Sequence, residues 1–191
     1  MSAEMAIAVA ILLPALGALI VAFLGQSPNA RDGAMLLIAS ATFAVVCTIY
    51  PEVASGGRPT LHLLEILPGL DLAFQVEPLG MLFSLVASGL WILTSLYAIG
   101  YMRGHHEENQ TRFFAFFAVA ISAALAAAFS GNMLTLFFSY EVLTLSTYPL
   151  VTHHRTPEAL RAGRIYMGIL LSTSIGLLLL GVLLTYHVAG T

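Results

Sequence analysis

The chain has 191 residues, of which 59% are hydrophobic and only 9% are charged, and its mean hydropathy is +0.91. This composition excludes an ordinary soluble domain and indicates an integral membrane protein. The net charge of −3 comes without a basic patch, and the single cysteine, Cys47, cannot form a disulfide within the chain. We therefore expect no nucleic-acid partner, no metal and no cofactor.

Six apolar segments are long enough to cross a hydrocarbon layer of about 30 Å as helices. Backbone groups in lipid must be paired within their own segment, so we predict an all-α membrane protein with six transmembrane helices. The first segment has no basic residue before it and is interpreted as a retained helix, not a signal peptide. The predicted spans are residues 5–24, 34–50, 79–100, 113–130, 132–151 and 165–187.

Residues 51–78, between the second and third spans, form the longest predicted extramembrane segment. Proline and glycine interrupt any continuous helix there, and residues 61–67 and 72–76 alternate between apolar and polar side chains. This pattern predicts a small β-hairpin on the outer surface.

Orientation follows from the arginines, because the chain has seven basic residues and none of them is lysine. Only Arg58 falls in an even-numbered loop. The positive-inside rule then places the odd-numbered loops in the cytoplasm and both termini outside. The arginines assigned to the odd-numbered loops are Arg31, Arg103, Arg112, Arg155, Arg161 and Arg164.

Glu141 is the only charged residue in the fifth span, and it lies near the middle of that span. A charge at this depth costs roughly 2.5–3.5 kcal/mol on insertion scales, so a membrane carboxyl suggests a proton or ion pathway. The alternative is a structural carboxyl that forms a hydrogen bond between helices. No Lys or Arg of the chain lies at the same depth, so a pathway through Glu141 requires a basic partner from elsewhere.

Polar side chains continue the Glu141 face toward the predicted cytoplasmic end. Thr144, Tyr148 and Thr152 lie within about 60° of Glu141 at 100° per residue, and hydroxyls both donate and accept hydrogen bonds as a proton relay requires. Toward the outside, the same face carries only apolar residues. These are Leu134, Phe137 and Phe138.

Two further groups are candidates for the same pathway. Ser172, Thr173 and the following Ser174 lie within about one turn of the depth of Glu141, although such hydroxyls commonly serve as interhelical hydrogen bonds. His153 and His154 follow the fifth span and could form an inner mouth that collects protons, or could simply be solvated.

The segments SLYAIGYMRGHHEENQTRFFAFF and SGNMLTLFFSYEVLTLSTYPLVTHHRTPEALRAGRIYMGILL carry a family resemblance. The chain resembles the antiporter-like proton-translocating subunits shared by respiratory complex I, Mrp-type cation/proton antiporters and membrane-bound hydrogenases. Within this family, it is most similar to the D-type subunit of Mrp antiporters. The resemblance runs from the first span to the end of the sixth.

The resemblance implies that Glu141 matches the essential membrane carboxylate, which works with lysines on later helices. Tyr140 stands where many members have tryptophan, and Ile165 stands where many have a basic residue. Family members have more than twice as many spans, arranged as two inverted five-helix repeats. We therefore expect that the chain is a fragment or that another polypeptide supplies the rest.

The expected organisation is one transmembrane domain over residues 1–191. Residues 1–100 would hold spans one to three with the outer loop 51–78, and residues 101–191 would begin an antiporter-like repeat. The expected function is that of the N-terminal part of a proton-translocating subunit in a multi-subunit complex of the inner membrane. Its expected partners are other membrane subunits, lipid, and protons with or without sodium.

Two questions stay open at this stage. No catalytic chemistry is visible in the chain, but the resemblance leaves open membership of an NADH:quinone-oxidoreductase-type translocase. The alternative function is a structural helix bundle that braces a larger membrane complex without transporting ions.

Overall fold

The computed structural model describes residues 2–189, except for the side chains of residues 67 and 189. Helices dominate it, and one two-stranded antiparallel sheet interrupts them. The elements are α1 (Ala3–Phe23), the 3₁₀ turn η1 (Leu24–Gln26), α2 (Pro28–Ala54), β1 (Thr60–Leu67), β2 (Leu70–Gln75), α3 (Pro78–Gly104), α4 (Gln110–Ala128), α5 (Met133–Val151), α6 (Pro157–Thr173), the π-helical turn η2 (Ser174–Leu179) and α7 (Leu180–Ala189).

Six helical segments of the described chain are long and apolar enough to cross a membrane, which confirms the expected all-α membrane fold. The sixth is continuous through α6, η2 and α7, and it starts at Pro157, two turns before the predicted residue 165. Thr156 caps this start by accepting a hydrogen bond from the Ala159 amide at 3.1 Å, and Pro157 occupies the first turn. Hydropathy identifies only the apolar part of such a helix, so the prediction missed its polar beginning.

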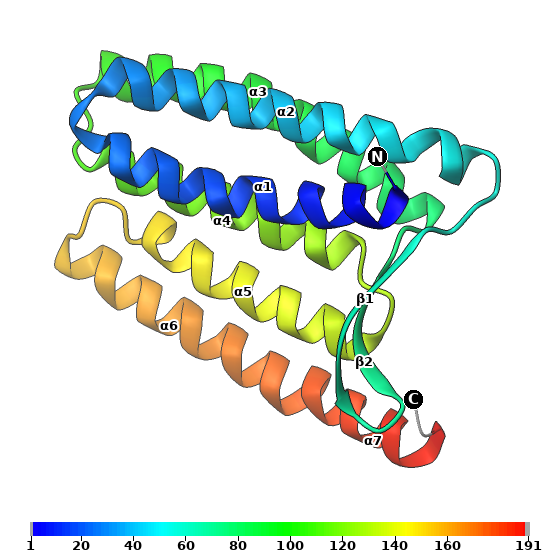
Figure 1. Ribbon diagram of the computed structural model, residues 1–191. Helices are drawn as coiled ribbons and strands as arrows, with labels where there is room; N and C mark the ends of the chain where they lie inside the picture. Colours follow the sequence, from blue (N-terminus) through cyan, green and yellow to red (C-terminus); the bar gives the residue numbers. More distant parts are fainter. Residues whose placement is uncertain (1, 190–191) are drawn as a thin grey trace.

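The helices pack in an order that differs from their order in the chain. In Figure 1, α2 and α3 lie along one side, α1 and α4 lie in the middle, and α5 and α6 lie on the other side. Most contacts of α4 are with α1 and α5, whereas the contacts of α6 are chiefly with α5. Helix α5 therefore has two neighbouring helices, α4 on one side and α6 on the other.

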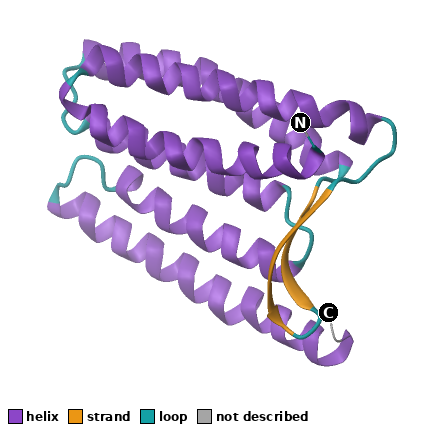
Figure 2. Cartoon of the chain, in the orientation of Figure 1, coloured by secondary structure: helices purple, strands orange, loops and turns teal. Residues whose placement is uncertain are grey.

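The hairpin predicted in the loop between the second and third spans is present and lies across one end of the bundle (Figure 2). Gly69 makes its turn with φ of 80°, in the left-handed region that glycine adopts at no steric cost. The Gln75 amide donates to the Phe129 carbonyl at 2.6 Å, and the Ala73 amide donates to the Thr135 hydroxyl at 3.0 Å. The hairpin thus ties α3 to the α4–α5 turn, and we call this the hairpin end.

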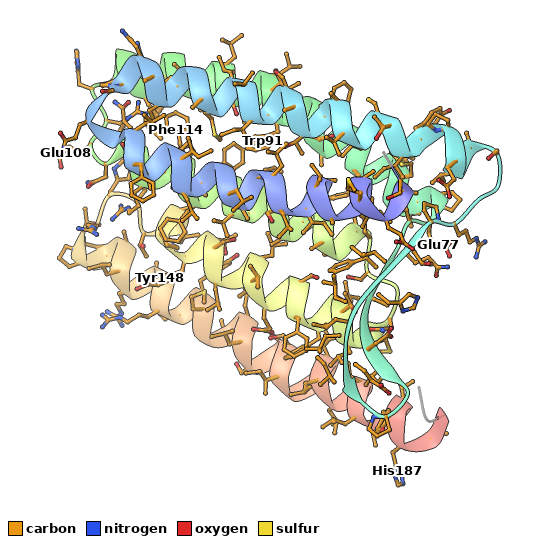
Figure 3. All side chains as sticks on the ribbon, in the orientation of Figure 1. Glu77, Trp91, Glu108, Phe114, Tyr148 and His187 are labelled. Atoms are coloured by element: carbon orange, nitrogen blue, oxygen red, sulfur yellow. The ribbon has the colours of Figure 1, made fainter. Side chains whose placement is uncertain are left out.

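The opposite end carries the turns at residues 24–27, 105–109 and 152–156, and we call it the arginine end. Most of its arginines lie in helices and not in loops: Arg31 is in α2, Arg103 in α3 and Arg112 in α4. The first and last described residues both lie at the hairpin end (Figure 1). The interior between the two ends is filled by large side chains, among which Trp91 and Phe114 lie between the helix layers (Figure 3).

Candidate functional site

Glu141 lies on the face of α5 that packs against the last span. The helix begins at Asn132, whose side chain caps it by accepting from the Thr135 amide at 2.8 Å. At 100° per residue, Leu134, Phe137 and Tyr148 lie within about 40° of Glu141 on the helix surface. The contacts of these neighbours therefore define what surrounds the carboxyl.

Toward the hairpin end, this face is closed by apolar side chains. Leu134 and Phe137 of α5 form a buried cluster with Val182 of α7 and with Leu70 at the hairpin turn. None of these side chains can pass a proton or hold a water by hydrogen bonds. The sequence predicted this apolar side of the stripe, and the structure adds the hairpin and α7 as its outer layers.

Toward the arginine end, α5 and α6 approach each other closely at Gly163. A Cβ atom at Gly163 would lie 2.3 Å from Thr152 Cγ2 and 3.1 Å from Tyr148 Cε2, so only glycine fits. Figure 3 shows Tyr148 at this end of the molecule. Tyr148 and Thr152 therefore do share the α6-facing side with Glu141, and Thr144 is buried one turn from it.

A hydrogen bond to its own helix occupies one hydroxyl of the predicted relay. The Thr152 hydroxyl donates to the Tyr148 carbonyl at 2.8 Å. A relay through Thr152 would require this hydroxyl to rotate away from its own helix. The role of these residues in proton movement stays a prediction.

The carboxyl of Glu141 has an orphaned oxygen. Its Oε1 is buried and forms no hydrogen bond with any described residue. A buried polar oxygen without a partner is costly, so such a group usually marks a site whose partner is a water, an ion or another chain. Among the carboxylate side chains that the structure describes, this observation separates Glu141 from the others.

The hydroxyls of the last span are divided between two faces. Ser172 and Thr173 are exposed and bond to carbonyls of their own helix, Gly168 and Ile169, so the structure does not bring them to α5. Ser174 is only 4% exposed. The sequence placed all three near the depth of Glu141 but could not tell which of them faces it.

His153 and His154 lie in a cluster of charged and polar side chains at the arginine end, and their role as an inner mouth stays a prediction. A cavity of about 190 Å³ is lined by His153 and His154 together with residues 105–109, and His154 Nδ1 lies 3.9 Å from Glu107. Both ring nitrogens of His153 are buried without a hydrogen-bond partner among the described residues. Burial, followed by the charge of Arg112, lowers the pKa of His153 from its ordinary value of 6.5.

A second charged cluster at this end was not anticipated from the sequence. Arg31 Nε donates to Asp32 at 2.7 Å, and Arg103 Nε donates to the other oxygen of Asp32 at 2.8 Å. Arg31 also donates to Gln110 at 2.9 Å and lies over the ring of Phe114. Arg31 and Asp32 are 3% and 4% exposed, so this ion cluster joins α2, α3 and α4 inside the bundle.

The signal for this cluster was an acidic residue among arginines. Asp32 is the only acidic residue near the first turn of α2, directly beside Arg31. The positive-inside rule uses only the positions of the arginines, so it does not reveal that Arg31 and Arg103 pair with Asp32.

Comparison with known proteins agrees with this architecture. Residues 69–114 match the family described as "NADH-Ubiquinone oxidoreductase (complex I), chain 5 N-terminus". The A/B-type component of a probable K(+)/H(+) antiporter from Rhizobium meliloti (strain 1021) is 31% identical over an alignment of 191 residues that covers 94% of this chain. The chain belongs to the antiporter-like subunit family and corresponds to its N-terminal portion.

A second relative is the A1-type component of a Na(+)/H(+) antiporter from Staphylococcus aureus, which is 25% identical over an alignment of 154 residues that covers 79% of this chain. The chain spans only 18% and 19% of the lengths of these two relatives. Both relatives are of the A or A/B type, so the particular similarity to the D-type component of Mrp antiporters stays a prediction.

Among solved structures, the chain superposes on one protein of the "membrane-bound sulfane sulfur reductase (MBS), an archaeal respiratory membrane complex" with a TM-score of 0.83. The sequence identity is 22%, and the match covers 97% of this chain and 38% of that one. This likeness supports the fold. Together with the six apolar helices, the relatives identify a multi-pass membrane protein of the antiporter-like family.

Proposed function

We propose that this chain is the N-terminal part of a proton-translocating subunit in a multi-subunit cation/proton antiporter or complex-I-like respiratory complex. Glu141 is the group that carries the proton at mid-membrane depth. The observation on which this rests is the orphaned, buried Oε1 of Glu141 at the α5–α6 interface. The relatives' names, which describe antiporters for K⁺ or Na⁺ and H⁺, support the same function.

The asymmetry of the α5 face supports a route from one end only. Apolar packing around Phe137 and Val182 closes the hairpin end, whereas Thr144, Tyr148 and Thr152 offer hydroxyls toward the arginine end. The His153–His154 cluster lies beyond them and is the proposed mouth. By the positive-inside rule, the arginine end faces the cytoplasm of a cell inner membrane, so protons enter Glu141 from the cytoplasm.

Release of the proton requires a counter-ion for the Glu141 carboxylate. An isolated charge in hydrocarbon costs several kcal/mol, and pairing with a cation offsets this cost. We propose that a basic side chain of a neighbouring span or of another protein in the complex supplies the cation. Changes in this pairing would couple protonation of Glu141 to the state of the rest of the complex.

A purely structural role is the second candidate, and the packing gives it one specific support. The close contact at Gly163 leaves no room between α5 and α6 beside Thr152, and the hairpin fixes the other end of α5. A brace needs these contacts but does not need an ionisable group at residue 141.

Replacement of Glu141 tests the two functions against each other. In membrane vesicles that contain the protein in its complex, Glu141→Gln is expected to abolish proton-coupled transport, and Glu141→Asp is expected to retain part of it. Glu158→Gln is the matched control, because Glu158 is an exposed carboxyl in the first turn of α6. A normal transport rate in assembled Glu141→Gln complexes would overturn the proposal in favour of the brace.

A further inference from the structure

The α5–α6 contact at Gly163 fixes the height of each residue along the interface. Thr152 of α5 meets Gly163 of α6 there. Glu141 lies eleven residues before Thr152, and Ser174 lies eleven residues after Gly163. Because the two helices are antiparallel, both residues lie about 16 Å from the contact, at the same depth.

The same spacing also sets the direction in which the two side chains point. Eleven residues are about three turns, so Glu141 lies within about 20° of Thr152 on α5, and Ser174 within about 20° of Gly163 on α6. The burial of the last span agrees with this geometry, because its buried residues are Gly163, Ser174 and Val182. Gly163 and Val182 both contact α5, and Ser174 lies on the same line between them.

The π-helical turn η2 keeps Val182 on the same side of the last span as Gly163 and Ser174. Val182 lies eight residues after Ser174, and in an uninterrupted α-helix it would be rotated by about 80° from the Ser174 direction. A π turn takes up about one additional residue, which turns Val182 back toward α5. The π turn begins at Ser174 itself, opposite Glu141, and π turns of this kind occur frequently at functional sites.

The hydroxyl of Ser174 is loosely held by its own helix. It donates to the Leu171 carbonyl at 3.2 Å, which is long for a hydroxyl donor, whereas the Thr152 hydroxyl forms its equivalent bond at 2.8 Å. The Leu171 carbonyl already accepts from the Ser174 amide, so loss of the hydroxyl would not leave it unpaired. The hydroxyl can therefore rotate toward α5 at little cost.

We propose that Ser174 positions the proton-carrying carboxyl by forming a hydrogen bond with Glu141 across the α5–α6 interface, and that the π turn holds it there. This inference rests on the proposed function of Glu141. A serine hydroxyl suits a group that changes charge, because it donates to the carboxylate and accepts from the protonated acid. Ser174 is thus a positioning residue, and the proton resides on Glu141.

The test compares Ser174→Ala with Thr48→Ala in the assembled complex. Thr48 is an exposed hydroxyl of α2 that bonds to the Val45 carbonyl of its own helix and lies outside the proposed pathway, so its loss is expected to leave transport unchanged. Ser174→Ala is expected to slow proton-coupled transport by about 10-fold, because hydrogen bonds to charged groups are among the stronger ones.

An infrared measurement separates a hydrogen bond from simple packing. The carboxylic-acid C=O band that disappears in Glu141→Gln is expected to move to higher frequency in Ser174→Ala, because the acid loses a partner. Slow transport with an unmoved band would assign Ser174 to packing and overturn the inference, as would a normal rate in Ser174→Ala. If Glu141→Gln abolishes transport and Ser174→Ala does not, only this inference fails; normal transport in Glu141→Gln removes the proposed function as well.

Discussion

The close contact at Gly163 gives a prediction whose size follows from the structure. In Gly163→Ala, the new methyl group would lie 2.3 Å from Thr152 Cγ2, whereas carbon atoms normally approach to about 3.5–4.0 Å. Thr152 caps the end of α5, and its hydroxyl bond to the Tyr148 carbonyl holds the side chain in place, so α6 must move away by about 1 Å. Overpacking of this kind typically costs about 1–3 kcal/mol.

The assay is the thermal stability of the solubilised complex, measured together with its transport rate. Gly163→Ala is expected to lower both, because separation of α6 also moves Ser174 away from Glu141. Gly168→Ala is the matched control, since a Cβ atom at Gly168 meets nothing within 4 Å. It should be neutral or should stabilise the helix by up to about 1 kcal/mol.

A second variant tests whether the Thr152 methyl group is the cause. Thr152→Ser removes Cγ2 and keeps the hydroxyl, so the double variant with Gly163→Ala is expected to recover most of the lost stability. The reasoning is refuted if Gly163→Ala behaves like Gly168→Ala, or if Thr152→Ser restores nothing.

Three further predictions concern the ends of the bundle. Asp32→Ala leaves the buried Arg31 without its nearest counter-ion and is expected to lower the stability in a thermal melt by about 3–5 kcal/mol. Glu77→Ala breaks an exposed pair and is the control; an equally small loss in Asp32→Ala would contradict the prediction. Asn132→Ala removes a helix cap and a hydrogen bond to the hairpin, so hairpin amides should exchange faster and stability should fall by about 2 kcal/mol. Unchanged exchange would contradict the anchoring of the hairpin by Asn132. The pKa of His153 is lowered in the folded protein, so the stability gained from its neutral ring is present above pH 6.5 and is lost as the pH falls below that value. The acid-induced drop in melting temperature should therefore be smaller in His153→Gln, and an equal drop would exclude His153 as its source.

Much of the fold follows from hydropathy and turn chemistry alone. The six spans and the hairpin were predicted from apolar segment length and from alternation around the Pro68–Gly69 turn, and the structure confirms both. The beginning of α6 was missed because its first residues are polar and its start is set by the Thr156 cap. The orientation of the termini across the membrane remains a prediction.

The candidate site was only partly accessible to sequence reasoning. The position of Glu141 and the apolar side of its stripe required only helical periodicity. The α6 partner face could not be predicted, because the π turn changes the periodicity after Ser174 and because the close contact depends on Gly163 meeting Thr152. The sequence does contain equal spacings of eleven residues, from Glu141 to Thr152 and from Gly163 to Ser174. These spacings place Ser174 beside Glu141 only when the contact between Gly163 and Thr152 is known.

The protonation change of Glu141 during turnover is the central claim, and infrared difference spectroscopy tests it most directly. The spectrum would be recorded on the complex in lipid while transport is driven and then stopped. The account predicts a carboxylic-acid C=O band that appears and disappears reversibly with turnover in the wild type and is missing from Glu141→Gln. A wild-type spectrum in which no such band changes, while transport proceeds at its full rate, would contradict the account.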